Sequence, residues 1–504
     1  MPRIRLRDLI ADLAVERVEG EIDLEVTDLV YDSRDTRPGA LFFCVRGERS
    51  DGHEFAAGAV ERGAVALVTE GPLDLDATQV RVADVRAAMA PLAVRFWDAP
   101  STRLDVAGIT GTNGKTTTAF LLRGILESVG TATGLLGTVR RVVGGTEEEV
   151  ERTTPEAIDL QRTLKRMLDG GDRACVMEVS SHALAYGRAD GIDFDVKVFT
   201  NLTQDHLDFH SDMEDYFGAK RLLFAGGAEA GRSAPGVAII NADDEYGRRL
   251  IDELRSAADR PLTFSASGAA ADFRAEDVRF DVAGSRFRCV GRDVEVGMQM
   301  RLPGPFNVAN ALAAIAAAHA LGVDPEQSAA ALAAVDRVPG RFEPVDEGQR
   351  FAVLVDYAHT PDSLENVLRA ARSVTEGRLI CVFGCGGDRD RDKRPLMGRI
   401  GAELSDLAVV TSDNPRSEDP AAIIAQILAG AGSDGVEVEP DRRAAIALAL
   451  EQASEGDTVV IAGKGHEEGQ EFEGGRKIPF DDRRVAGEEL RRLAARPTTP
   501  GATT

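Results

Sequence analysis

Short apolar runs, each bounded by polar or glycine-rich segments, recur along most of the chain and predict buried β-strands. These runs cover residues 29–34, 41–45, 64–68, 104–109, 175–180, 196–201, 237–241, 353–357, 379–383, 407–411 and 459–462. Helical periodicity lies between several of them, most clearly at 55–62, 116–129 and 213–224. Such alternation is typical of α/β proteins with largely parallel sheets, which bind ligands at the carboxyl ends of the strands.

Breaks in this pattern predict three domains, as the length of 504 residues also suggests. A segment with Pro and Ser at 98–102 predicts the first linker, and a new unit starts near Gly340. The predicted domains are 1–100, 101–340 and 341–495, followed by a polar, disordered tail at 496–504. We expect a small α/β domain, a central parallel-sheet domain resembling a phosphate-loop ATPase, and a Rossmann-like domain without the dinucleotide fingerprint. Strand-like fragments at 262–300 have no assignment.

The composition is that of a globular protein, 43% hydrophobic and 28% charged. Acidic residues number 84 against 59 basic ones, which gives a net charge of −25. This balance argues against nucleic-acid binding, which needs a basic face. It is compatible with anionic small substrates only where basic residues cluster locally.

The sequence predicts a cytoplasmic protein without a membrane span. No apolar run reaches about 18 residues, and the Ala-rich stretch 309–323, which contains Asn310 and His319, predicts a core helix. Residues 1–13 are charged and lack the apolar segment of a signal peptide. The cysteines are too scattered for a disulfide framework or a zinc site and fit reduced thiols. They are Cys44, Cys175, Cys289, Cys381 and Cys385.

The segment Gly111-Thr-Asn-Gly-Lys-Thr116 joins the predicted strand 104–109 to the predicted helix 116–129. Glycines let the backbone turn its N–H groups toward one anion at a helix N-terminus. Lys115 adds a positive charge, and the Thr116 hydroxyl suits Mg²⁺. The general Walker A pattern wants Gly where Ile109 stands, yet the strand, the turn and the helix are in register. We therefore predict a nucleoside triphosphate site and not a chance turn.

Polar residues also follow other predicted strands. Glu178 ends its strand and predicts a Mg²⁺ ligand, the alternative being a salt-bridged or solvated glutamate. His206 follows another strand and lies among acids, which favours a metal ligand or a polar site residue. Lys220, judged by helical periodicity alone, is a surface lysine.

Three loops of the last domain follow strands of the same predicted sheet, at 384–390, 411–416 and 463–467. Arg389 and Arg416 suit a carboxylate, which a guanidinium binds through two hydrogen bonds. Asp413 and Glu467 suit an ammonium group. Each residue alone is as easily a solvated loop charge, but the set predicts an amino-acid site.

At this point the chain resembles the Mur ligases, ATP-dependent amide ligases of peptidoglycan precursor synthesis, over nearly its whole length. The resemblance is carried by Gly111-Thr-Asn-Gly-Lys-Thr-Thr117, Met177-Glu-Val-Ser-Ser-His182, Asn201-Leu-Thr-Gln-Asp-His206, Tyr216-Phe-Gly-Ala-Lys220, Gly304-Pro-Phe-Asn307, Gly340-Arg-Phe342, Asp356-Tyr-Ala-His359, Asp413-Asn-Pro-Arg416 and Gly463-Lys-Gly-His-Glu467. Within the family, the Asp-Asn-Pro-Arg box is similar to that of members that add diaminopimelate to UDP-N-acetylmuramoyl-L-alanyl-D-glutamate. Lysine-adding members have a different box.

The resemblance implies roles for residues across the chain. It implies an ATP site formed by Gly111, Thr112, Asn113, Gly114, Lys115, Thr116, Thr117, Asn307, Arg341 and Asp356. It implies contacts to the UDP-sugar-dipeptide from Tyr31, Ser33, Thr153, Thr154, Ser180 and Arg188, and to diaminopimelate from Arg389, Asp413, Asn414, Pro415, Arg416, Gly463 and Glu467. Arg152 and Tyr186 stand where relatives often have a polar amide, so their contacts stay open.

The resemblance also implies the chemistry. Lys220 matches a lysine that such enzymes carry as a carbamate, in which CO₂ turns the amine into a carboxylate-like Mg²⁺ ligand. The implied metal ligands are Thr116, Glu178, His206 and carbamylated Lys220, and the implied catalytic residues are Lys115, Lys220, Glu178 and His206. ATP would phosphorylate the D-glutamyl γ-carboxylate, and the diaminopimelate amine would then displace phosphate. Closure of the domains around the substrates is expected.

Two other functions stay open at this stage. A lysine-adding member or a folylpolyglutamate synthase would use the same chemistry, although the first domain and the 413–416 box argue against both. A phosphate-loop switch would hydrolyse nucleotide slowly and use no amino acid. We expect a monomer and the meso isomer, but the sequence alone does not separate meso from LL diaminopimelate.

Overall fold

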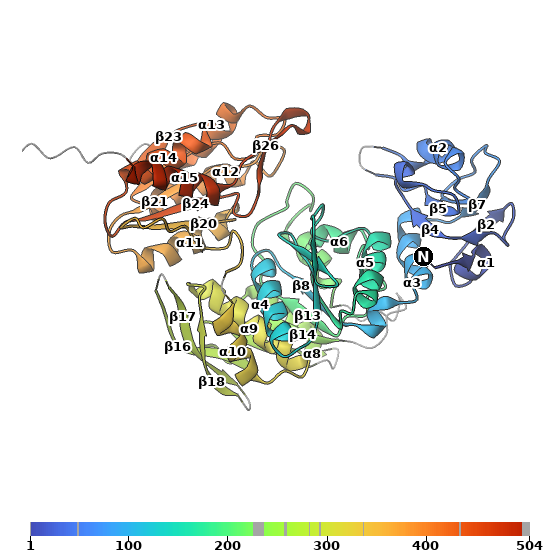
Figure 1. Ribbon diagram of the computed structural model, residues 1–504, viewed down its shortest axis with the longest axis horizontal. Helices are drawn as coiled ribbons and strands as arrows, with labels where there is room; N and C mark the ends of the chain where they lie inside the picture. The colour runs from blue at the N-terminus through green and yellow to red at the C-terminus, as the bar shows by residue number, and fades with distance from the viewer. Residues whose placement is uncertain are drawn as a thin grey trace, which may run out of the picture. The chain divides into compact units, whose positions relative to one another are not determined.

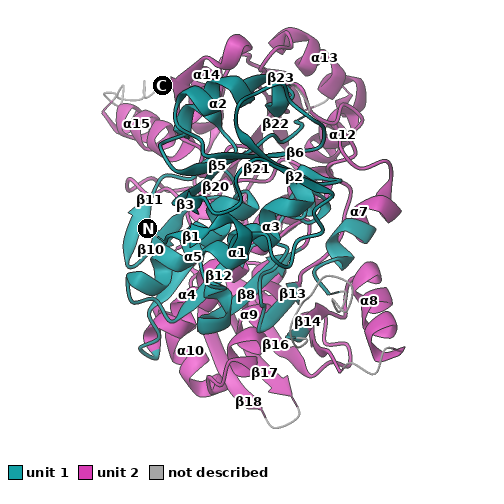
Figure 2. Ribbon diagram, turned by 90° about the vertical axis from the view of Figure 1, so that its right-hand side faces the viewer, with its two compact units in different colours: residues 1–110, 129–198, 218–238 teal, residues 111–128, 199–217, 239–504 magenta. Residues whose placement is uncertain are grey.

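A computed structural model describes residues 2–47, 50–224, 236–256, 260–281, 283–291, 294–335, 337–432 and 435–495. The chain divides into two compact units, shown in Figure 2. Unit 1 comprises Met1–Thr110, Val129–Val198 and Gly218–Ala238, and unit 2 comprises Gly111–Ser128, Phe199–Phe217 and Ile239–Thr504. The predicted tail at 496–504 lies outside the described residues. Among those residues no helix is both long and apolar enough to span a membrane.

Unit 1 begins with a small sheet of mostly parallel strands (Figure 1). Its strand order is β2 (Arg17–Glu19), β7 (Thr78–Arg81), β6 (Ala66–Thr69), β5 (Ala40–Phe43) and β4 (Asp28–Val30). The helices are α1 (Leu6–Leu9), α2 (Ala56–Glu61) and α3 (Val85–Phe96), the 3₁₀ turns are η1 (Ser33–Asp35), η2 (Gly52–Phe55) and η3 (Pro100–Arg103), and β1 (Ile4–Arg5) pairs with β3 (Glu25–Val26).

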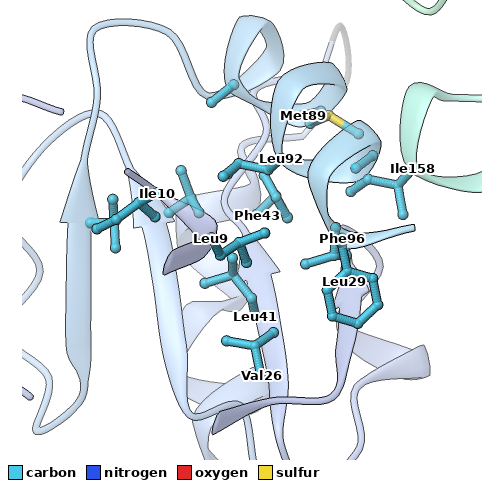
Figure 3. Packing of buried hydrophobic residues seen from close by; sticks show 14 of the residues in the cluster. Leu9, Ile10, Val26, Leu29, Leu41, Phe43, Met89, Leu92, Phe96 and Ile158 are labelled. Atoms are coloured by element: carbon cyan, nitrogen blue, oxygen red, sulfur yellow. The ribbon is translucent and has the colours of Figure 1, made fainter. Parts of the chain in front are cut away.

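Side chains alternate across this sheet as the period of two requires. Leu41 and Phe43 of β5 face a core shared with α1 and α3, as Figure 3 shows. Phe42 of the same strand faces the opposite core, toward α2. Both faces are therefore covered, which explains why these strands read as continuous apolar runs.

The rest of unit 1 contains the strand that leads into the phosphate turn. Its strand order is β11 (Thr146–Glu148), β10 (Arg141–Val143), β9 (Thr133–Leu136), β12 (Ala174–Glu178) and β8 (Asp105–Thr110), with α5 (Ala157–Asp169) and α6 (Ser181–Ala185). β12 is parallel to both β8 and β9. The predicted strand 175–180 thus ends at Glu178, two residues early.

Three elements pass from one unit to the other: β13 (Val196–Phe199), α7 (Met213–Arg221) and β14 (Val237–Asn241). Unit 2 continues with α4 (Lys115–Ser128), α8 (Glu245–Ser256), β15 (Leu262–Ser265), β16 (Phe273–Asp281), β17 (Gly284–Gly291), β18 (Glu295–Met300), α9 (Pro305–Ala320) and α10 (Pro325–Ala334). The unassigned stretch 262–300 forms β15 to β18, of which the last three are antiparallel neighbours. Helix α9 is buried along most of its length, as its alanines predict.

The last sheet of unit 2 is parallel except at one edge. Its order is β19 (Glu343–Pro344), β20 (Ala352–Asp356), β24 (Thr458–Ala462), β21 (Leu379–Phe383), β22 (Leu407–Val410) and β23 (Val436–Val438). Helices α11 (Pro361–Val374), α12 (Lys393–Leu404) and α13 (Pro420–Ala431) share one core with it, and α14 (Arg442–Gln452) and α15 (Asp482–Ala494) share the other. A hairpin of β25 (Gly469–Glu471) and β26 (Lys477–Pro479), with η4 (Glu473–Gly475) between them, completes the unit. This is the predicted doubly wound, Rossmann-like arrangement.

Candidate active site

The phosphate turn occupies the short interval between the end of β8 and the start of α4. Gly111 and Gly114 have φ of 145° and 86°. A Cβ on Gly111 would lie 1.9 Å from Thr200 Oγ1, and one on Gly114 would lie 2.3 Å from Asn310 Oδ1. Both positions therefore require glycine on grounds of backbone angle and of space.

A second loop, which follows β13, holds this turn from outside. The Thr112 amide donates to the Asn201 carbonyl at 2.9 Å, and the Asn113 amide donates to Asn201 Oδ1 at 2.9 Å. The Thr200 hydroxyl donates to the Asn113 carbonyl at 2.6 Å. The backbone amides of Thr112 and Asn113, two residues predicted to bind ATP, thus stabilise the turn itself.

Lys115 folds back over the turn that precedes it. Its Nζ donates to the carbonyls of Gly111 and Thr112 at 2.9 and 2.8 Å. The next residue, Thr116, accepts a hydrogen bond from Arg341 Nη2 at 3.0 Å. The structure thus brings together three residues predicted to hold the triphosphate: Lys115, Thr116 and Arg341. Thr117 lies buried in the first turn of α4.

Asn307 and Asp356, two further residues predicted to bind the nucleotide, are buried near Gly304 and Gly340. Asn307 donates to the Pro303 carbonyl at 2.8 Å. Asp356 accepts the amides of Phe342 and Ala358 at 2.7 and 2.8 Å. Burial raises the pKa of Asp356 to about 6, against the lowering effect of Arg341. Contacts of Asn307 and Asp356 with a base or ribose stay predictions.

Sequence reasoning missed Asn310 as a site residue. It lies one helical turn after Asn307 on α9 and donates to Asn307 Oδ1 at 3.3 Å. It also lies beside Gly114 of the phosphate turn. Two asparagines three residues apart share one face of a helix. That spacing within an otherwise apolar helix was the available signal.

Glu178 ends β12 as a buried carboxylate, 1% exposed, so the solvated alternative is wrong. It accepts the Thr138 amide at 2.9 Å and the Thr138 hydroxyl at 3.0 Å. Thr138 also lies 3.0 Å from the Thr153 hydroxyl, and Thr154 donates to the Glu178 carbonyl at 2.9 Å. The predicted metal ligand and two predicted substrate contacts therefore meet at the end of one strand.

Arg188, another predicted substrate contact, belongs to a cluster around the buried Glu156. Arg188 and Arg152 bind Glu156 Oε1 at 2.8 and 2.9 Å, and Arg86 binds Oε2 at 3.2 Å. The Tyr186 ring lies under two of these guanidinium groups, at 4.9 and 5.4 Å. Three cations around one carboxylate leave a local positive charge, which suits an anion. Ser180 instead caps α6 through the Ala183 amide.

Tyr31 lines a cavity of about 490 Å³ in unit 1. Its hydroxyl donates to Asp159 Oδ2 at 2.6 Å, and burial together with Asp159 raises the pKa of Tyr31. Arginines and acids line this cavity in equal number: Arg34, Arg141, Arg152, Arg162 and Arg166 with Asp32, Asp35, Glu151, Glu156 and Asp159. In a chain of net charge −25, this cavity lining is thus locally balanced in charge. Ser33 begins the adjoining 3₁₀ turn.

The predicted metal ligands come from both units. Glu178 and Lys220 belong to unit 1, and Thr116 and His206 to unit 2. Lys220 is 1% exposed, so its interpretation as a surface lysine is wrong. Thr116 and Glu178 offer the hard oxygen donors that Mg²⁺ prefers. An ammonium cannot bind Mg²⁺, so Lys220 fits such a site only as a carbamate. The four-residue set stays a prediction.

His206 has a left-handed backbone, φ 55°. Its Nε2 lies 3.4 Å from Asp205 Oδ2, and its ring meets Tyr216 edge to face with centroids 6.0 Å apart. Positive φ at a non-glycine residue is uncommon and marks a constrained position.

The loops after β22 and β24 share a network of charges. Buried Lys464 donates to Asn414 Oδ1 and Glu467 Oε2 at 2.8 and 2.9 Å, and Asn414 Nδ2 donates to the same Glu467 oxygen at 2.8 Å. Burial alone raises the pKa of Asp413, but Lys464 and Arg442 outweigh it and hold that pKa below its usual value. Asp413 is thus held as a carboxylate, and Glu467 is held in place by Lys464 and Asn414. Sequence reasoning assigned no role to Lys464, although it lies within the motif.

The predicted carboxylate-binding arginines differ in environment. Arg416 has φ 51° and donates to Glu471 Oε2 at 3.0 Å and to the Gly387 carbonyl at 2.8 Å. It also lines, with Pro415, a cavity of about 790 Å³. Arg389 is exposed and donates to the Asp388 carbonyl at 2.8 Å. Gly463 has φ 118° beside Asp413 Oδ2, which lies 2.4 Å from where a Cβ would stand.

Three family models match successive stretches of the chain. They are the Mur ligase family catalytic domain at 25–97, the Mur ligase middle domain at 109–318 and the Mur ligase glutamate ligase domain at 340–465. The predicted three-domain α/β class is therefore confirmed, while the exact domain boundaries stay predictions.

Individual proteins agree with these models. The chain is 48% identical to the UDP-N-acetylmuramoyl-L-alanyl-D-glutamate–2,6-diaminopimelate ligase of Syntrophomonas wolfei, over 97% of this chain and 99% of that protein. A solved ligase of the same name is 31% identical, with a TM-score of 0.68 over 98% of this chain and 100% of the other. The MurF ligase of Thermotoga maritima, solved in complex with ADP, is 19% identical, with a TM-score of 0.63 over 93% and 97%, and shares the fold. The chain belongs to the Mur ligase family.

Proposed function

We propose that this protein is an ATP-dependent ligase that joins 2,6-diaminopimelate to UDP-N-acetylmuramoyl-L-alanyl-D-glutamate. One observation carries the proposal. A single compact unit contains a phosphate turn and, at the strand ends of its last sheet, arginine and carboxylate groups suited to a zwitterion. The relatives that match nearly the whole chain are named as ligases of this same reaction.

The chemistry requires activation, because a free carboxylate is a poor electrophile. ATP converts the D-glutamyl γ-carboxylate into an acyl phosphate, and the diaminopimelate amine attacks the acyl carbon and displaces phosphate. Lys115 and Arg341 neutralise the charge that develops on the phosphates, and the 411–416 and 463–467 loops orient the amine. Mg²⁺, held by Thr116, Glu178, His206 and carbamylated Lys220, would add charge neutralisation when bound.

The test measures ADP release in the presence of UDP-N-acetylmuramoyl-L-alanyl-D-glutamate, with diaminopimelate or lysine offered separately. We expect turnover that depends on both the UDP substrate and diaminopimelate, with an amide product detected by mass spectrometry. Equal turnover with lysine would refute the amino-acid specificity. ADP release independent of any amino acid would favour a nucleotide switch and refute the ligase. Separate meso and LL arms would settle the isomer, for which we propose meso.

A further inference from the structure

Two arginines are buried beneath the strand-end loops of the last sheet, and neither is among the predicted substrate contacts. Arg394 is 0% exposed and Arg442 is 2% exposed. A buried guanidinium is costly unless it is paired and its donors are used. The partners of these two side chains therefore indicate what they hold.

Arg442, the first residue of α14, joins two loops to α15. Its Nε and Nη2 bind the two oxygens of Asp482 at 2.8 and 2.7 Å, and Asp482 is itself fully buried. The same guanidinium donates to the Ala462 carbonyl at 2.9 Å and to the Ser412 carbonyl at 3.4 Å. Those carbonyls lie where β24 ends and where the loop after β22 begins.

Arg394, near the start of α12, makes the corresponding connection on the other side. Its Nη1 and Nη2 bind the two oxygens of Glu418 at 3.0 and 2.9 Å, and Nη2 also donates to the Gly386 carbonyl at 3.0 Å. Glu418 in turn accepts the Asp388 amide at 2.7 Å. The Arg394 guanidinium holds the pKa of Glu418 far below its usual value, at about 2, so this pair stays charged at neutral pH.

The two ion pairs link three loops in series. Arg394 and Glu418 join the loop after β21 to the loop after β22, and Arg442 with Asp482 joins the latter to the end of β24, from which the third loop starts. These loops carry all the predicted diaminopimelate contacts. A guanidinium fork has a fixed geometry, so each pair sets a spacing as well as a charge balance.

We propose that Arg394 and Arg442 are positioning residues that hold these loops at the separation needed to bind both charged groups of one amino acid. The inference rests on the proposed diaminopimelate-adding function. Neither side chain needs to touch the substrate. Lysine in place of arginine keeps the charge but cannot reach, at the same time, the carboxylate and the one or two carbonyls that each arginine binds.

The experiment measures steady-state kinetics of Arg442→Lys and Arg394→Lys in the full-length protein. For each variant we expect the KM for diaminopimelate to rise about ten-fold or more, as losses of supporting contacts do. The KM values for ATP and for the UDP substrate should stay within about two-fold, because the carbonyls that these arginines bind lie in, or directly before, the loops predicted to bind the amino acid. A purely structural defect would instead lower the kcat of the reaction without raising the KM for diaminopimelate selectively.

Arg443→Lys is the matched control. Arg443 is adjacent in the sequence and also links α14 to α15, through Glu488 and Glu489 at 2.7 and 2.8 Å, but neither of these partners belongs to a strand-end loop. We expect its KM values to equal those of the wild type. An increase like that of Arg442→Lys would overturn the proposal, since any link between the two helices would then suffice.

A further variant guards against misfolding. Arg442→Met with Asp482→Leu replaces the buried pair by apolar packing, which commonly preserves stability, whereas removing one partner alone would leave a buried charge unpaired. We expect this double variant to melt near the wild type and still show the raised KM for diaminopimelate. An unchanged KM in the folded double variant would overturn the inference alone, whereas a wild type that never consumes diaminopimelate would refute the proposed function.

Discussion

At the scale of single residues, burial decides which charged groups can serve chemistry. Lys220 reads as a surface lysine in the sequence, but the fold buries it, as it buries Glu178. A buried amine and a buried carboxylate are rare without a specific partner or function. Substitution of either residue would therefore test its role directly.

Lys220→Ala should lower ligation by at least about 100-fold, as expected when a ligand to a catalytic metal is lost. Lys220→Arg is the matched comparison, because arginine keeps the positive charge but cannot form the carbamate. We expect both variants to be inactive in the ADP-release assay. Substantial activity in Lys220→Arg would contradict the carbamate and leave only a role for the charge.

Asp356 makes stability depend on pH. Burial raises the pKa of Asp356 to about 6 in the folded protein, whereas an unfolded Asp has a pKa of about 3.9. The folded state therefore holds the proton more tightly, so this group's contribution is complete below about pH 4 and is lost as the pH rises through about 6. The difference is worth about 3 kcal/mol.

Asp356→Asn should remove that dependence, because the amide does not titrate. Relative to the wild type, the variant's thermal midpoint should improve between about pH 4 and about pH 7. Loss of one amide hydrogen bond adds an offset that is equal at every pH, so only the slope is diagnostic. Asp74→Asn, at an exposed carboxyl, is the control. Parallel calorimetric profiles of Asp356→Asn and the wild type would refute the prediction.

At the scale of elements, the phosphate turn depends on its neighbours as much as on its own glycines. The loop after β13 donates hydrogen bonds to the turn and accepts others from it. Asn310 of α9 lies in the space beside Gly114. A turn held on two sides is preorganised for an anion and needs little reorganisation when it binds.

Gly111→Ala should disrupt this element. The added Cβ would overlap Thr200 Oγ1, so the turn must move, and a shift of this size is expected to slow ADP formation about 100-fold. Gly130→Ala is the control, because Gly130 also has positive φ but has open space around its Cβ position. Similar losses in both variants would show that backbone strain, and not the contact with Thr200, is responsible.

At the scale of the whole molecule, charge and exposed apolar surface bear on association. The net charge is −25, and the large apolar side chains exposed among the described residues come from separate segments. They are Ile22, Phe55, Leu222, Val237, Val438 and Ile478. Stable oligomer interfaces need a large, more continuous apolar area.

We therefore expect the protein to be a monomer. Sedimentation equilibrium over a wide concentration range, at physiological ionic strength, should give the mass of one chain throughout. A mass that rises toward that of a dimer with concentration would contradict the prediction, and repeating the experiment at high salt would show whether charge repulsion had opposed association.

The α/β class, the phosphate turn and many of the parallel strands, such as β8, β12, β20 and β24, could be predicted from the sequence, whereas β7 and β9 were not predicted. Hydrophobic patterns with a period of two or 3.6 residues and the spacing of glycines are local properties, so they can be recognised in the sequence alone. The sequence did not assign 262–300. Strands β16 to β18 alternate between more buried and more exposed positions, but their pairing with one another cannot be read from local sequence. Strand pairing is a tertiary property.

The surroundings of each charged group, by contrast, follow from the folded structure. Three features join residues that no local pattern connects: the burial of Lys220, the proximity of Lys464 to Asp413 and Glu467, and the convergence of three arginines on Glu156. Electrostatic energy depends on distance and on exclusion of water, and the fold sets both. The sequence identified the groups that could take part in the chemistry. Their packing set the charge, the partners and the solvent access of each group.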